Sequence, residues 1–216
     1  PTRGSYSLFG IERRDRRIHN ARKQISAIVE TASLVPSLTA IENMRYQELY
    51  SGIRLTPKER NELLVKVHLE NVGNKKVKNF SLGMRQRLAI ACALLGDTEL
   101  MILDEPANGL DPKGMKEMRE LIVKLNKEKG ITFIISSHIL SELDKMATTY
   151  GFIDNGMILK EVNAEEVHTN DKVEYIYKVN TTKGVKEVIE SKFNANCTVT
   201  DETTFSLDKE IDSLDL

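Results

Sequence analysis

Two apolar runs in this 216-residue sequence each end in polar side chains that could act on phosphate and metal. Asp104 and Glu105 come directly after the run 100–103. His138 closes a Ser-Ser-His triplet that follows the run 131–135. If both runs are parallel strands, these groups emerge at one edge of a sheet, where open α/β sheets bind ligands. There Asp104 could hold Mg²⁺, Glu105 could orient or deprotonate a water, and His138 could contact a phosphate oxygen. Alternatively, these residues only begin turns.

The sequence Ser-Leu-Gly-Met at 81–84 could contribute to an anion site. Ser81 is a good N-cap for the helix that the following apolar spacing predicts, and Gly83 permits close approach of the backbone. The free N–H groups and the dipole of such a helix favour a negative charge. The alternative is a plain capped helix. That alternative is weakened by the two polar clusters that follow in order.

The elements that would position these groups alternate in an α/β pattern. Apolar runs at 100–103 and 131–135 predict two parallel strands, and the first is typical of a strand buried on both faces. Two capping boxes predict paired helices within 40–66, the second with proline at its first position. Other expected elements are strands at 5–10 and 24–29, helices at 82–95 and 112–129, a hairpin around 154–156, and a smaller α/β region at 163–216.

Composition excludes several classes of protein. The chain has 31 basic and 32 acidic residues, so its net charge of −1 creates no overall attraction to nucleic acid or anionic lipid. No apolar run approaches the ~18 residues of a membrane span. The arginine-rich stretch 12–23 is interleaved with Glu12 and Asp15 and contains no aromatic stacking residue, which favours a solvated surface over nucleic-acid binding. Cys92 and Cys197 are predicted to be separate reduced thiols.

The motifs together resemble the ATPase subunits of ABC transporters. The resemblance is carried by the signature motif at 80–87, the Walker B strand at 100–106, the D-loop at 108–111 and the H-switch at 136–138. It covers residues 1–162 in order and at the family's spacing. It implies a P-loop NTPase-like parallel sheet core with a helical subdomain at about 39–80. The region 163–216 would be a small accessory α/β extension.

The resemblance also implies a mechanism that uses ATP and Mg²⁺. Asp104 would bind Mg²⁺, Glu105 would activate water, and His138 would sense the γ-phosphate. Two nucleotide-binding domains, identical or paralogous, would pair head to tail. A set of further residues would contact nucleotide, namely Ser81, Leu82, Gly83, Met84, Glu30 and Asp111. A separate transmembrane permease subunit would be the other partner, at the cytoplasmic face of the membrane, and no nucleic acid would be involved.

The sequence departs from the family pattern at two places. Glu30 stands at the Q-loop position where glutamine is usual, and an ionised carboxylate accepts but cannot donate hydrogen bonds. This glutamate, with the Ser-Leu-Gly-Met signature, is similar to the bacitracin-resistance and lantibiotic-immunity branch of exporters. The pattern G-x-x-x-x-G-K-[ST] of the Walker A loop occurs nowhere in the sequence. We therefore expect an N-terminally truncated chain that is inactive alone.

Two alternatives to an exporter ATPase remain at this stage. One is a non-transport ABC ATPase of DNA maintenance or translation. Only two short helices separate Glu30 from Ser81, which leaves no room for the long coiled coils of the DNA-maintenance proteins. Region 163–216 carries no second set of motifs, which argues against a two-domain translation factor. The other alternative is a non-catalytic regulatory relative, against which the presence of Asp104, Glu105 and His138 argues.

Overall fold

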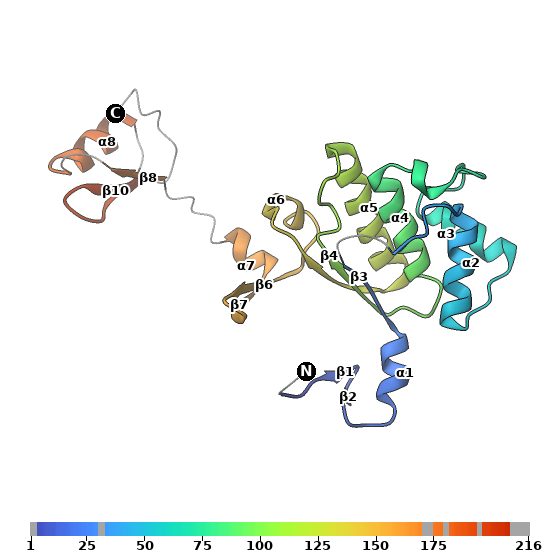
Figure 1. The fold of residues 1–216 in the computed structure, drawn as a ribbon. Coiled ribbons are helices and arrows are strands. Elements are labelled where there is room, and N and C mark those ends of the chain that lie inside the picture. The colour runs from blue at the N-terminus through green and yellow to red at the C-terminus, as the bar shows by residue number, and fades with distance from the viewer. Residues whose placement is uncertain (1–3, 30–32, 170–174, 179–181, 194–195, 208–216) are drawn as a thin grey trace. The chain divides into compact units, whose positions relative to one another are not determined.

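The computed structural model describes residues 4–29, 33–169, 175–178, 182–193 and 196–207. The chain forms two compact units, Pro1–Met146 and Ala147–Leu216, which are described separately (Figure 1). The sequence predicted a boundary at residue 162. The units divide earlier because the predicted hairpin and the helix after it contact each other within the second unit.

A three-stranded parallel sheet organises the first unit. Its strands are β3 (Ile25–Val29), β4 (Leu100–Asp104) and β5 (Thr132–Ser136), in the order β3-β4-β5. β4 is paired along its whole length, with Ile28 beside Leu103 and Asp104 beside Ser136. The parallel arrangement predicted for the two apolar runs is therefore confirmed.

Two helices pack on one face of this sheet. They are α4 (Leu82–Ala93) and α5 (Pro112–Lys129), which contact β3 and β5 respectively (Figure 1). α4 begins at the predicted cap, Ser81. α5 occupies the predicted range, with Asp111 as its cap and the left-handed Gly130 at its end. Met101 and Leu103 of β4 are fully buried beneath them. The core of the unit lies between this face and the two helices.

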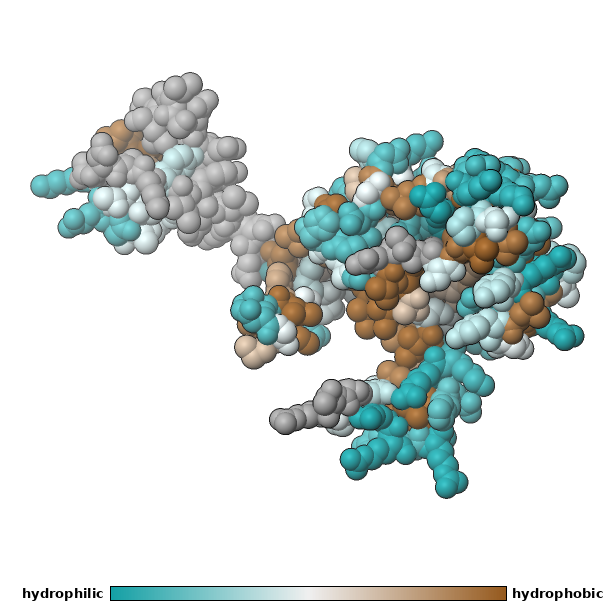
Figure 2. Space-filling view, in the orientation of Figure 1, coloured by the Kyte–Doolittle hydropathy of each residue, from teal (hydrophilic) through white to brown (hydrophobic). Residues whose placement is uncertain are grey.

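The opposite face of the sheet is more open in the described residues, so β4, predicted to be buried on both faces, is fully buried on one face and only partly buried on the other. Val29 at the end of β3 is 65% exposed, and Ile134 in β5 is 55% exposed. Side chains alternate along a strand, and both helices cover the face of Met101 and Leu103. The side chains on the other face are partly or largely exposed, and apolar surface gathers over this part of the unit in Figure 2.

The helical subdomain consists of α2 (Ala40–Ser51), α3 (Pro57–Lys66) and a short 3₁₀ turn, η1 (Val77–Asn79). Both predicted capping boxes are present, Thr39 with Glu42 and Thr56 with Glu59. α2 ends at Gly52 in the left-handed region. The subdomain packs against α4, so it shares one hydrophobic core with the sheet.

The N-terminal segment differs from the single strand predicted at 5–10. Two short antiparallel strands form instead, β1 (Ser7–Leu8) and β2 (Ile11–Glu12), and α1 (Ile18–Lys23) follows. The reversal occurs at Phe9 and Gly10, which both have positive φ, at 50° and 74°. Such a turn favours glycine at its second position, so Gly10 is the residue in the sequence that indicates the reversal.

The second unit contains a hairpin and a small α/β sheet. The hairpin pairs β6 (Thr149–Asp154) with β7 (Met157–Asn163) through the predicted Asn155-Gly156 turn, and α7 (Ala164–Thr169) follows. The small sheet has the order β8-β10-β9 with α8 alongside. Its elements are β8 (Tyr175–Lys178), α8 (Val185–Phe193), β9 (Cys197–Val199) and β10 (Thr204–Leu207). No helix in the described ranges is both long and apolar enough to cross a membrane.

Candidate functional site

The carboxyl edge of the sheet brings together the polar groups that follow β4 and β5. Asp104 and Ser136 are register partners on the open face. The Ser136 hydroxyl donates to Asp104 Oδ1, and the backbone N–H of Glu105 donates to Ser136 Oγ at 3.0 Å. His138 Nδ1 lies 2.9 Å from Glu105 Oε2. The three residues predicted from sequence therefore form one hydrogen-bonded cluster, and Ser136 joins them.

Glu105 leaves the sheet through a strained backbone turn. Its φ of +48° is in the left-handed region, which non-glycine residues adopt rarely and at a cost of about 1–3 kcal/mol. The turn aims the carboxylate toward His138 and keeps it only partly exposed, at 27%, while the His138 side chain is 64% exposed. Glu105 can therefore accept a proton or orient a water from the open side of the cluster.

Asp104 suits a magnesium ion. Oδ1 is occupied by the Ser136 hydroxyl, whereas Oδ2 accepts no hydrogen bond from any residue that the structure describes. A single free carboxylate oxygen matches how proteins usually hold Mg²⁺, through one or two carboxylates, several waters and substrate phosphate. No group of three or more acidic, His or Cys side chains that could hold a metal occurs in the described part of the chain.

A second cluster forms around the N-terminus of α4. Ser81 Oγ accepts the Met84 N–H at 3.2 Å, so this hydroxyl is used as the helix cap. The N–H groups of Leu82 and Gly83 lie in the first turn, where the helix itself supplies no acceptor. Arg85 donates to the carbonyl of Phe80, so it braces the turn from within the chain. The four residues predicted to contact nucleotide thus form an ordered helix start.

The loop between β4 and α5 lies against this helix start. A Cβ added at Gly83 would meet Leu110 Cδ2 at 3.6 Å, and one added at Gly109 would meet Leu82 Cδ2 at 3.2 Å. Gly109 also has a φ of +73°. The same loop begins at Glu105, whose carbonyl accepts the Asn108 N–H at 3.0 Å. One short segment therefore connects the acidic cluster with the α4 turn.

Two other predicted site residues have different outcomes. Asp111 Oδ1 accepts the Gly114 N–H at 2.9 Å, so its carboxylate caps α5 rather than extending freely into solvent. Glu30 lies outside the described residues. Ser136 was not singled out in sequence, although its place in the Ser-Ser-His triplet, in register with Asp104, was the available signal.

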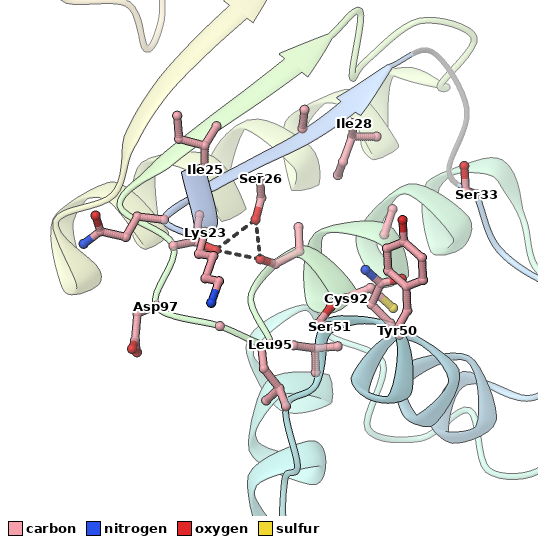
Figure 3. A pocket seen from close by; sticks show the side chains of 18 of the residues that line it. Lys23, Ile25, Ser26, Ile28, Ser33, Tyr50, Ser51, Cys92, Leu95 and Asp97 are labelled. Atoms are coloured by element: carbon pink, nitrogen blue, oxygen red, sulfur yellow. Dashed lines mark hydrogen bonds between the residues drawn. The ribbon is translucent and has the colours of Figure 1, made fainter. Parts of the chain in front are cut away.

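A groove of about 1120 Å³ lies beside β3, between the sheet edge and the ends of α2 and α4 (Figure 3). Lys23, Tyr50 and Cys92 are among its lining residues, and Tyr50 is 84% exposed. One wall is fixed by Ser26, whose hydroxyl donates to the Ala93 carbonyl at 2.8 Å. Burial raises the pKa of the Cys92 thiol to about 12. Sequence reasoning did not find this groove, because it is formed by segments far apart in the chain.

Comparison with known proteins places these features in a family. The family profile described as ABC transporter matches residues 1–108. The chain is also 42% identical, over 78% of its length and 73% of the relative's, to the lantibiotic transport ATP-binding protein SrtF of Streptococcus pyogenes. The chain belongs to the ABC transporter family. The predicted resemblance to ATP-binding subunits of the bacitracin and lantibiotic branch is confirmed.

Another relative and a solved structure agree with this assignment. The bacitracin transport ATP-binding protein BcrA of Enterococcus faecalis is 37% identical over 94% of this chain and 66% of its own length. The ATP-binding cassette MJ0796, solved as a dimer in a post-hydrolysis state with ADP and Pi, matches with a TM-score of 0.64 and 26% identity. That match covers 76% of this chain and 75% of the cassette. The chain spans roughly half to three quarters of the curated relatives.

Proposed function

We propose that this chain carries the Walker B, signature and H-switch parts of an ATP-hydrolysing subunit of an ABC exporter. The observation that supports this most is the hydrogen-bonded cluster of Asp104, Glu105 and His138 at the carboxyl edge of a parallel sheet. Membership of the ABC transporter family and similarity to named transport ATP-binding proteins support the same conclusion.

In the proposed mechanism each residue of the cluster has one task. Asp104 would hold Mg²⁺ through Oδ2, and the ion would neutralise charge on the ATP phosphates. Glu105 would accept a hydrogen bond from the attacking water and take its proton. His138 is hydrogen-bonded to that carboxylate and exposed on its other side, so it can contact the γ-phosphate while restraining Glu105.

We propose that the α4 turn acts on ATP held by a second nucleotide-binding domain. The Leu82 and Gly83 N–H groups and the helix dipole would face the phosphates of that ATP. Asp111 would act indirectly, because its carboxylate already caps α5. The dimeric MJ0796 cassette supports such a pairing for this fold.

We propose that a transmembrane permease subunit docks in the groove beside β3, with the chain at the cytoplasmic face of the membrane. The groove has apolar residues such as Ile53, exposed aromatic surface at Tyr50 and polar residues such as Lys23, a combination that suits a partner helix or loop. A Ser51→Cys variant should form disulfide cross-links with cysteines placed in the cytoplasmic loops of the permease. A lack of cross-links with every loop would contradict docking in this groove.

For the cargo, we propose a peptide antibiotic of the bacitracin or lantibiotic type. The support is similarity to BcrA and SrtF, whose names assign transport of those compounds to them. Deletion of the gene should sensitise cells selectively to peptide antibiotics and not to unrelated drugs. Unchanged sensitivity across a panel of bacitracin and several lantibiotics would remove the cargo proposal and leave the ATPase proposal standing.

The ATPase proposal has its own test. The chain alone should show no micromolar site for Mg-ATP by isothermal titration, because no G-x-x-x-x-G-K-[ST] loop occurs in it. A subunit that contains this chain and a phosphate loop should bind and hydrolyse ATP. A clear site in the chain alone would mean that the phosphate contacts have been misplaced, and a phosphate-loop subunit without turnover would contradict the proposal.

A further inference from the structure

Ser136 occupies the centre of the polar cluster although no role has been assigned to it. Its side chain lies on the open face of the sheet, beside Asp104 in register. Its hydroxyl acts as both a donor and an acceptor, because it donates a hydrogen bond to Asp104 Oδ1 and accepts one from the Glu105 N–H at 3.0 Å. A hydroxyl has one proton, so this pairing fixes the direction of both hydrogen bonds.

The two bonds act on the parts of the site that most need restraint. Glu105 has a φ of +48°, and such a backbone persists only where its surroundings hold it. Its N–H is shared between Ser136 Oγ and the Ser136 carbonyl, at 3.0 and 3.2 Å. The other bond occupies Oδ1 of Asp104 and so presents Oδ2, the oxygen suited to a metal.

We propose that Ser136 is a positioning residue that holds the metal-binding carboxylate of Asp104 and the backbone of Glu105 in one fixed relation through its single hydroxyl. This inference rests on the proposed ATPase function and deepens it. Ser136 acts through its two neighbours and needs no contact with ATP. The ligand that its restraint serves is a divalent cation together with the attacking water.

The role predicts a specific kinetic pattern for Ser136→Ala. Without the hydroxyl, the Asp104 carboxylate can rotate and the Glu105 N–H keeps only the backbone acceptor. In a subunit that contains this chain and a phosphate loop, kcat should fall about 10–100-fold, and the Mg²⁺ concentration for half-maximal rate should rise, as for residues that orient metal ligands. The KM for ATP should stay within about twofold, because the lost interactions are not made to ATP.

Two further variants separate positioning from a general effect on the strand. Ser136→Thr keeps a hydroxyl on a residue that suits strands, and should retain most of the activity. Thr132→Ala removes a hydroxyl from the same face of the same strand, at its other end, and should leave kcat and the Mg²⁺ requirement unchanged. In the 216-residue chain itself, Ser136→Ala should speed hydrogen exchange at the Glu105 amide, with no nucleotide present.

The outcomes distinguish this inference from the function on which it rests. If Glu105→Gln abolishes turnover and Ser136→Ala does not lower it, the positioning role is wrong and the ATPase proposal stands. Equal losses in Ser136→Ala and Ser136→Thr would also overturn the role, since the hydroxyl would then not be what matters. If the unchanged subunit, with its phosphate loop, shows no turnover of ATP, the proposed function fails. Faster exchange at the Glu105 amide would then still support the structural restraint.

Discussion

The carboxylates of the helical subdomain and of the carboxyl edge of the sheet differ in their burial and in their hydrogen bonding. In the subdomain, Glu48 of α2 is buried and accepts two hydrogen bonds from Arg60 of α3, one of them at 2.9 Å. Arg60 also donates to the Leu55 carbonyl at 2.7 Å, so the pair braces the loop between the helices. At the sheet edge, Glu105 is partly exposed, has a strained backbone, and is hydrogen-bonded through its side chain to the exposed His138.

The difference lies in how completely each carboxylate is satisfied. A buried charge is tolerated only when its partners are complete, which makes the Glu48–Arg60 pair structural. Among the described residues, Glu105 and Asp104 each have one carboxylate oxygen that accepts no hydrogen bond, which suits a site that binds a ligand. The comparison therefore predicts that substitutions in the subdomain mainly change stability, whereas substitutions at the sheet edge mainly change turnover.

The largest stability effect is expected at Arg60. Arg60→Met should lower the free energy of unfolding by about 3–5 kcal/mol, because Glu48 is left as an unpaired buried charge. Urea unfolding measures this loss.

The double variant Glu48→Gln with Arg60→Met should recover part of the lost free energy of unfolding, since no charge remains. Lys58→Ala, which removes only an exposed 4.0 Å pair with Glu62, is the matched control and should cost less than about 0.5 kcal/mol. Equal losses in Arg60→Met and Lys58→Ala would break the comparison.

The same pair predicts a pH dependence. The hydrogen bonds from Arg60 hold the pKa of Glu48 below its ordinary value of 4.5. A carboxylate with a lowered pKa in the folded state stabilises fully above the unfolded pKa, and that contribution is lost as pH falls through the folded pKa. In Arg60→Met the unpaired, buried Glu48 takes up its proton at a higher pH than in the unchanged chain. The difference in unfolding free energy between the two should therefore be largest at neutral pH and shrink steadily as the pH is lowered. A difference independent of pH would mean that Arg60 acts by packing alone.

At the sheet edge, Glu105→Gln should lower turnover at least about a hundredfold, or roughly 2.7 kcal/mol in activation free energy, with ATP binding retained. The subunit that carries this chain and a phosphate loop is required for the measurement. The free energy of unfolding should change by less than about 0.5 kcal/mol, because Glu105 is partly exposed. Undiminished turnover would leave Glu105 as a residue of the turn only.

The smallest effects concern two helix caps with the same geometry. Thr56 and Ser81 each accept an N–H three residues on, at 3.3 and 3.2 Å. Thr56→Ala and Ser81→Ala should each cost about 1 kcal/mol of unfolding free energy. Only Ser81→Ala should also reduce ATP-driven dimerisation, measured by size-exclusion chromatography with the Glu105→Gln subunit. If Thr56→Ala weakens the dimer equally, the α4 turn has no special part in it.

Local signals explain which features could be predicted. The caps at Thr39, Thr56 and Ser81, and the strands before Asp104 and His138, depend on residues close in sequence, and all of them are present. The Asn155-Gly156 turn belongs to the same class. The family resemblance added the order of the motifs, which no local pattern supplies.

The features that were missed depend on register and on packing between distant segments. The contact of Ser136 with Asp104 requires that β4 and β5 pair in one particular register. The open face of β5 could not be predicted from its apolar residues, because burial depends on whether a helix covers that face. The groove beside β3 requires α2, α4 and the sheet edge together. Hydrophobic periodicity indicates which side chains favour burial, but it does not indicate which distant segment packs against them.

The thiol of Cys92 has a practical consequence for labelling the groove. With its pKa raised to about 12, the Cys92 thiol has far less reactive thiolate at mildly alkaline pH than an ordinary cysteine has. Burial also raises the pKa of Cys197. Both native thiols are therefore less reactive than an exposed cysteine would be. A fluorophore placed through Ser51→Cys would report on the mouth of this groove with little signal from the native thiols.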